Sequence, residues 1–143
     1  MARNLSKDEA LAFIAAEPPR TGKLATVRAN GAPHVAPVWV ALDGDRIVFT
    51  TGENTVKGKA IRRDPRVALS FDDERPPFTF VIVEGEATIS RDMDELLHWA
   101  TLLGGRYMGE ELAEQYGRRN AVEGELLVRV ESTKIIGIAD IAD

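Results

Sequence analysis

Short runs of alternating apolar and polar side chains, the spacing of half-buried β-strands, account for most of this chain. We expect strands over residues 23–29, 32–42, 46–51, 67–71 and 78–90, and a last strand or bent pair of strands over residues 126–138. Asn30-Gly31 is typical of a two-residue hairpin, and Asp43-Gly44-Asp45 is typical of a second tight turn. Because hairpins join antiparallel neighbours, the pattern predicts an antiparallel sheet.

Three residues within these strands predict local irregularity. Pro33 and Pro37 cannot donate hydrogen bonds to a neighbouring strand, so they indicate a sheet edge, a bulge or a stretch of backbone that faces a ligand. Gly85, in the longest expected strand, predicts a bulge or a point of close approach.

Helical signals lie at the edges of this β pattern. Ser6 and Glu9 form a capping box that predicts a helix over residues 6–16. Residues 92–117 have helical spacing, with a break expected at Gly104-Gly105 and a second helix around residues 109–116. Six antiparallel strands with helices at their edges predict a mainly β protein, a six-stranded small barrel in one domain of residues 1–143, rather than a doubly wound sheet.

Residues 50–66, TTGENTVKGKAIRRDPR, join an expected strand to a short helix that Asn54 is expected to cap. In a chain of net charge −5, this segment has five basic side chains against two acidic ones. The basic residues are Lys57, Lys59, Arg62, Arg63 and Arg66. Helix starts attract anions, and Thr50, Thr51 and Gly52 allow a phosphate to approach the backbone closely, so the segment predicts a phosphate site. The alternative is that Thr50, Thr51 and Gly52 are ordinary strand and turn residues and that the basic side chains form a solvated helix face.

Composition narrows the function classes. With 44% hydrophobic and 29% charged residues, the 143-residue chain is typical of a globular protein. It has no cysteine, which excludes disulfides and thiolate chemistry, and its two histidines, His34 and His98, offer little for a zinc or iron centre. Lys7, Asp8 and Glu9 interrupt the N-terminal segment, so we expect neither a signal peptide nor a spanning helix, and a cytoplasmic protein with no membrane partner. A basic segment on an acidic chain points to a local anion rather than a nucleic-acid surface, so we expect no nucleic-acid partner.

Three stretches resemble a known family. The runs KLATVRANGAPHVAPVWV, IVFTTGENTVKGKAIRRDPRVALSF and FVIVEGEATIS are similar to those of the pyridoxamine 5′-phosphate oxidase-like split β-barrel flavoproteins, and within them to the deazaflavin-dependent oxidoreductases that use coenzyme F420. The resemblance extends over residues 5–140. It implies an FMN-binding split-barrel-like fold and a homodimer with two cofactor sites between the subunits, which suits a chain too short to enclose a site alone.

The resemblance also implies roles for individual residues. It places the cofactor phosphate at Lys57 and the flat ring system against Pro37, Val38 and Trp39. Lys59 cannot point at the same phosphate from a regular helix, because successive residues rotate by about 100°. Lys59 is therefore expected to contact the cofactor tail or solvent.

Other candidates have ordinary structural alternatives. His34 can hydrogen-bond the ring or substrate, or be a structural histidine. Phe78 and Phe80, from the second subunit, are expected to wall the substrate pocket, or else to pack as strand residues. Arg118 and Arg119 can meet the acidic tail of a deazaflavin, or be solvated.

The function expected from this resemblance is an F420-dependent reductase that passes hydride from reduced F420 to an electron-poor unsaturated small molecule. Because the cofactor carries the chemistry, the catalytic residue is unknown at this level. Two alternatives remain open: an FMN-binding oxidase or flavin reductase of the same fold, and a non-catalytic cofactor- or haem-binding protein.

Overall fold

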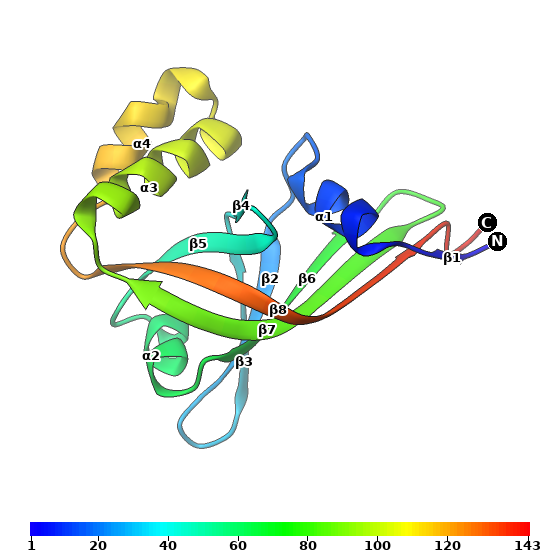
Figure 1. Ribbon diagram of the computed structural model, residues 1–143, viewed down its shortest axis with the longest axis horizontal. Helices are drawn as coiled ribbons and strands as arrows, with labels where there is room; N and C mark the ends of the chain where they lie inside the picture. Colours follow the sequence, from blue (N-terminus) through cyan, green and yellow to red (C-terminus); the bar gives the residue numbers. More distant parts are fainter.

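One antiparallel sheet of eight strands, flanked by helices, dominates the computed structural model, which describes residues 1–143 (Figure 1). The strands are β1 (Arg3–Asn4), β2 (Gly22–Val27), β3 (Pro33–Val38), β4 (Ala41–Asp43), β5 (Arg46–Gly52), β6 (Arg66–Asp73), β7 (Thr79–Ser90) and β8 (Glu125–Ala139). The helices are α1 (Lys7–Ala15), α2 (Val56–Arg63), α3 (Met93–Met108) and α4 (Ala113–Asn120), with a 3-10 turn η1 (Glu110–Leu112) between the last two. No helix is both long and apolar enough to span a membrane.

The expected count of six strands is wrong, and the reason explains how the sheet curls. The stretch expected as one strand over residues 32–42 is two strands, because β3 pairs with β2 whereas β4 pairs with β5. In the strand order β3-β2-β6-β7-β8-β5-β4, these two are the opposite ends. Only Trp39-Val40 separates them in sequence, so the chain itself joins the two ends of the sheet, in line with a split barrel. The short β1 adds the eighth strand by pairing with β8.

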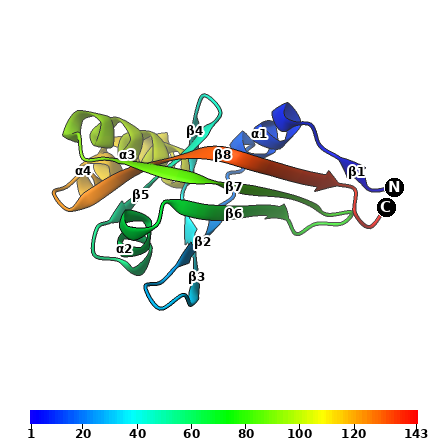
Figure 2. The same cartoon turned by 60° about the horizontal axis from the view of Figure 1, so that its bottom comes forward.

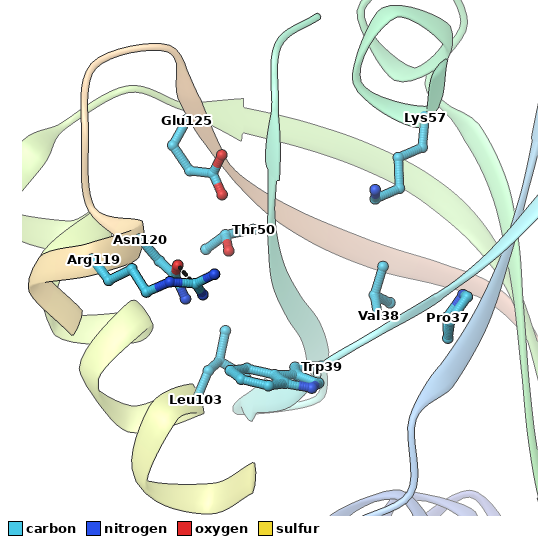
Figure 3. Close-up of a pocket in the computed structure, with 9 residues that line it drawn as sticks. All are labelled: Pro37, Val38, Trp39, Thr50, Lys57, Leu103, Arg119, Asn120 and Glu125. Carbon is cyan, nitrogen blue, oxygen red and sulfur yellow. Dashed lines mark hydrogen bonds between the residues drawn. The ribbon is translucent and has the colours of Figure 1, made fainter. Parts of the chain in front are cut away.

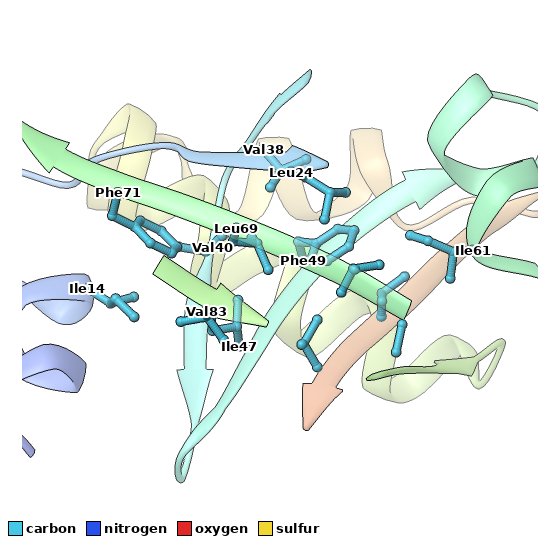
Figure 4. Close-up of a cluster of buried hydrophobic side chains, with 14 of the residues drawn as sticks. Ile14, Leu24, Val38, Val40, Ile47, Phe49, Ile61, Leu69, Phe71 and Val83 are labelled. Carbon is cyan, nitrogen blue, oxygen red and sulfur yellow. The ribbon is translucent and has the colours of Figure 1, made fainter. Parts of the chain in front are cut away.

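The inner face of the curled sheet encloses the core (Figure 4). In β7, Val81 and Val83 are buried whereas Ile82 between them is only partly covered, which is the alternation that the sequence pattern predicts. Phe49 and Phe71 are the largest fully buried side chains, and each contributes about 2 to 3 kcal/mol by leaving water. Helix α1 adds Ile14 to this cluster.

The capping box predicted for the first helix is confirmed. The Glu9 backbone N–H donates to Ser6 Oγ at 3.1 Å, and the Ser6 N–H donates to Glu9 Oε1 at 3.0 Å. The bulge predicted at Gly85 is also confirmed: the pairing of β7 with β8 shifts register between Glu84 and Gly85. A Cβ at Gly85 would collide with the carbonyl oxygen of Glu131, so only glycine fits there.

The break expected at Gly104-Gly105 is wrong, because α3 runs through both glycines and ends only at Met108. Both are buried under α4, and a Cβ on Gly104 would lie 2.6 Å from Cβ of Tyr116. These glycines therefore allow two helices to pack closely instead of breaking one. The chain turns at Gly109, whose φ of 100° suits glycine.

The two ends of the sheet differ. Helices α3 and α4 lie at one end, together with α2 and the start of β8, whereas the N- and C-termini and the β6–β7 loop lie at the other (Figures 1 and 2). The candidate cavity lies at the helical end.

Candidate functional site

A cavity of about 290 Å³ lies at the helical end of the sheet (Figure 3). Three helices and three strand segments contribute to its lining, so residues far apart in sequence meet there. The lining residues are Pro37, Val38, Trp39, Thr50, Lys57, Leu103, Arg119, Asn120 and Glu125.

One wall of this cavity is flat, apolar and firmly held. The Trp39 ring stacks on Tyr107 with ring centroids 5.3 Å apart and an interplanar angle of 2°. The Tyr107 hydroxyl in turn accepts from the Val40 N–H at 3.0 Å and donates to the Arg20 carbonyl at 2.7 Å. Because Tyr107 is fixed at its polar end, it holds the Trp39 indole in place beside Pro37.

Helix α3 is fastened over the site by Arg106, whose side chain is only 11% exposed. Its guanidinium donates to the carbonyls of Ile14 at 2.9 Å and Ala15 at 3.0 Å, the last residues of α1. It also donates to the Val40 carbonyl at 3.1 Å. Carbonyls at a helix end lack partners within the helix, so Arg106 satisfies them and ties α1, α3 and the β3–β4 link together.

Two cations face the cavity without a carboxylate partner. Lys57 and Arg119 are absent from the salt bridges of the chain. The Arg119 guanidinium donates to Asn120 Oδ1 at 3.3 Å and lies 5.4 Å from the centre of the Tyr116 ring, which orients it. In Figure 3 the Arg119 guanidinium lies below Thr50, and the Lys57 side chain extends toward the cavity from the opposite side. The cavity thus offers an anion two cations that form no salt bridge.

Glu125, the first residue of β8, places a carboxylate in the same space. Burial raises the pKa of Glu125, while the Thr50 hydroxyl and the Lys57 ammonium oppose that rise. Its Oε1 would lie 3.6 Å from a Cβ on Gly52, the residue paired with it across β5 and β8. The cavity therefore combines two cations and one carboxylate.

The start of α2 explains why Lys57 reaches the cavity. The helix is capped by Thr55, not by Asn54 as expected, because Thr55 has extended backbone angles and its Oγ1 accepts from the Gly58 N–H at 3.0 Å. A Cβ on Gly58 would collide with the Gly52 carbonyl oxygen, so this glycine lets the helix approach the end of β5 closely.

Five of the residues predicted for cofactor binding line the cavity: Pro37, Val38, Trp39, Thr50 and Lys57.

Two others serve the cap of α2 instead. The Thr51 side chain is buried, and its Oγ1 lies 2.9 Å from Thr55 Oγ1. The Gly52 carbonyl accepts from the Thr55 hydroxyl at 2.8 Å, and Gly52 borders a neighbouring hollow that also includes Glu53 and Glu123.

The remaining predicted residues lie outside the cavity within this chain. Lys59 is exposed on α2. His34 pairs with Thr26 across β3 and β2, and its Nδ1 is buried without a hydrogen-bond partner. Phe78 and Phe80 lie where β7 begins, at the other end of the sheet, and the Phe78 carbonyl accepts from the N–H of Ile141 near the C-terminus at 3.2 Å.

Sequence reasoning did not single out Leu103, Asn120 or Glu125, and it considered Arg119 only for a cofactor tail. Leu103 reads as an ordinary apolar position of a helix, and Glu125 as the polar start of a strand. Their proximity depends on how α3 and α4 pack against the sheet and on the pairing of β8 with β5. No sequence spacing gives that information.

Comparison with known proteins shows the family and the fold of the chain. The family model described as pyridoxamine 5′-phosphate oxidase matches residues 6–136. A solved structure of a conserved hypothetical protein from Mycobacterium tuberculosis is 26% identical, with a TM-score of 0.78 over 92% of this chain and 82% of that one. A solved F420 reductase is 30% identical, with a TM-score of 0.66 over 83% of this chain and 90% of that one.

A FAD-binding protein from Mesorhizobium loti shares the fold at 20% identity, with a TM-score of 0.67 over 96% of each chain. No curated protein sequence matches this chain.

Proposed function

Because the chain belongs to the pyridoxamine 5′-phosphate oxidase family, we propose that it is an oxidoreductase that binds coenzyme F420 and reduces an electron-poor unsaturated small molecule. The observation that carries this proposal is the cavity itself, which has a flat apolar wall on one side and two cations without carboxylate partners on the other. The 30% identity between this chain and a solved F420 reductase supports a deazaflavin as the cofactor.

The residues of the cavity suit such a cofactor. Lys57 and Arg119 are the partners of its phosphate, because neither forms a salt bridge and both face the cavity. Pro37, Val38 and Trp39 are the surface for its ring system, since Pro37 has no N–H and Trp39 is held flat by its stack. When bound, reduced F420 supplies the hydride.

The contribution of the chain is then to position and to enclose. The stack on Trp39 and the anchoring of α3 by Arg106 hold the walls of the cavity before any ligand enters. A preformed site lowers the entropic cost of binding and fixes the orientation of the two reactants. Leu103 of α3 and Arg119 and Asn120 of α4 line one side of the cavity, where they are expected to exclude water from a bound ligand.

The site is proposed to be completed by a second copy of the chain. Residues of β2, β3, β6 and β7 line an apolar hollow of about 450 Å³. Val35 beside it is 65% exposed, and Val27 is 41% exposed. Ile82 lines this hollow, and Phe80, two residues earlier on β7, lies on the same face of the strand, so a second copy docked here would bring an aromatic strand face to its partner.

Size-exclusion chromatography with light scattering tests this dimer. Val35→Glu is expected to yield a monomer, because it buries a charge in the proposed interface. Leu97→Glu, at an α3 position that is 44% exposed, is the matched control and is expected to leave the dimer intact. A monomeric wild-type protein would refute the proposal.

Titration of the purified protein with F420, FMN and haem tests the cofactor, using ligand fluorescence or absorbance. We expect micromolar binding of F420 and oxidation of reduced F420 by an enone or quinone. Micromolar binding of FMN with none of F420 would instead favour a flavin enzyme of the same fold, and haem binding alone would favour a non-catalytic carrier.

A further inference from the structure

Glu125 is an unexpected residue in a cavity proposed to hold a phosphate. A carboxylate beside an anion site weakens binding through like-charge repulsion. Figure 3 shows the Glu125 carboxylate directed toward Thr50, in the same space that Lys57 and Arg119 enter. This carboxylate therefore needs a functional explanation.

The carboxylate does not simply neutralise one of the two cations by contact. No salt bridge joins Glu125 to Lys57 or Arg119. Lys57 still acts on Glu125 electrostatically: burial raises the pKa of Glu125, and the positive charge of Lys57 lowers it. The three charges thus remain available to a ligand.

Other charges near Glu125 lie in the neighbouring hollow. Glu53 and Glu123 line that hollow together with Glu125. The Glu53 carboxylate is paired with Arg91, whereas Glu123 is exposed. The charge balance inside the cavity is consequently set by Lys57, Arg119 and Glu125.

Two cations and one carboxylate leave a single excess positive charge in the cavity. A ligand phosphate with one negative charge balances this excess. A phosphate with two negative charges gains twice the attraction to Lys57 and Arg119 and meets twice the repulsion from Glu125, whereas its desolvation cost rises fourfold, with the square of its charge. Because Glu125 cancels the attraction of one cation, less attraction is left to offset that desolvation cost. The arrangement therefore penalises the second charge.

We propose that Glu125 selects the charge of the bound phosphate, so that the cavity accepts a phosphodiester with one negative charge in preference to a phosphomonoester with two. This inference rests on the proposed function and deepens it. The phosphate of F420 is a diester, whereas that of FMN is a monoester with a charge of about −1.5 to −2 at neutral pH. Glu125 then makes the site prefer F420 to FMN through charge alone.

The experiment compares two probes that share one ring: 8-hydroxy-5-deazaflavin 5′-phosphate and its monomethyl phosphodiester. Kd is measured from probe fluorescence at pH 8, where the monoester carries two charges. Glu125→Gln is expected to tighten binding of the diester by about fivefold, the size typical of one partly solvated charge pair. The monoester is expected to gain about the square of that factor, roughly 25-fold, because it carries twice the charge.

Two variants control for effects other than charge. Glu125→Asp keeps the charge and is expected to keep the wild-type preference between the probes within about twofold. Glu123→Gln removes an exposed carboxylate two positions earlier and is expected to change neither Kd by more than about twofold.

One result needs no variant: in the wild-type protein the diester must bind more tightly than the monoester, and the reverse order overturns the inference. An equal gain for both probes in Glu125→Gln, or no gain, also overturns it, while binding of F420 itself keeps the proposed function. If the folded wild-type protein binds F420 and neither probe, the charge of the phosphate does not govern binding and the inference fails. If it binds no deazaflavin at all, the proposed function fails and this inference fails with it.

Discussion

Replacing Lys57 by alanine removes one of the two cations that face the cavity and changes little else. The Lys57 side chain is half-buried at the cavity wall. It forms no hydrogen bond or salt bridge that stabilises the fold. The free energy of unfolding is therefore expected to stay within about 0.5 kcal/mol of the wild-type value.

The effect on cofactor binding is expected to be much larger. A hydrogen bond to a charged partner contributes about 1.5 to 3 kcal/mol when desolvated. Because Lys57 is only partly buried and Arg119 remains, we take the lower end of this range. A loss of about 1.5 kcal/mol raises the Kd for F420 slightly more than tenfold.

The assay is a fluorescence titration of F420 into each variant, with thermal unfolding measured in parallel. Lys59→Ala is the matched control, because Lys59 is exposed on the same helix and does not line the cavity. Raising the salt concentration is expected to reduce the difference in Kd for F420 between the wild type and Lys57→Ala, because salt screens the charge of Lys57. Equal Kd values for Lys57→Ala and Lys59→Ala would show that the phosphate does not bind at Lys57.

Three further outcomes are expected. Gly58→Ala forces α2 away from the carbonyl oxygen that ends β5, so urea unfolding should show a loss of about 1 to 3 kcal/mol, together with weaker F420 binding; unchanged stability would contradict the close approach. Tyr107→Phe leaves a buried backbone N–H unpaired and should cost about 1 to 3 kcal/mol, whereas Tyr116→Phe, whose hydroxyl has no protein partner, should cost little by the same measurement. The Arg66 guanidinium lowers the pKa of Asp64 to about 2, so this carboxylate stabilises the fold above its unfolded pKa near 3.8 and loses that effect as the pH falls toward 2. Asp64→Asn should therefore be less stable than wild type at pH 7, with a difference that shrinks between pH 4 and pH 2 in thermal melts; a constant difference would exclude this ion pair as the cause.

Local signals were sufficient for much of the fold. The capping box at Ser6 and the bulge at Gly85 are confirmed, because both depend on contacts within a few residues or on the absence of a Cβ. The same local reasoning failed at Gly104, since a glycine inside a helix can either break it or admit a neighbouring helix. That choice depends on where Tyr116 of α4 packs.

The strand count failed for a related reason. Nothing in the alternation over residues 32–42 shows that the chain leaves β2 at Trp39 and pairs with β5 beyond it. The alternation of a strand predicts which of its side chains are buried, but it does not predict which other strand pairs with it.

The sequence by itself determined the alternating strands and the basic segment, because each depends on residue type and short-range spacing. Lys57 as a partner for phosphate is a prediction that the family resemblance adds to that segment. Only the tertiary structure placed Arg119 and Glu125 opposite Lys57, since they come from segments more than 60 residues away that meet through helix packing and strand pairing. The charge of the cavity is a sum over side chains from separate elements. It therefore exists only once the sheet has curled and the helices have closed over its end.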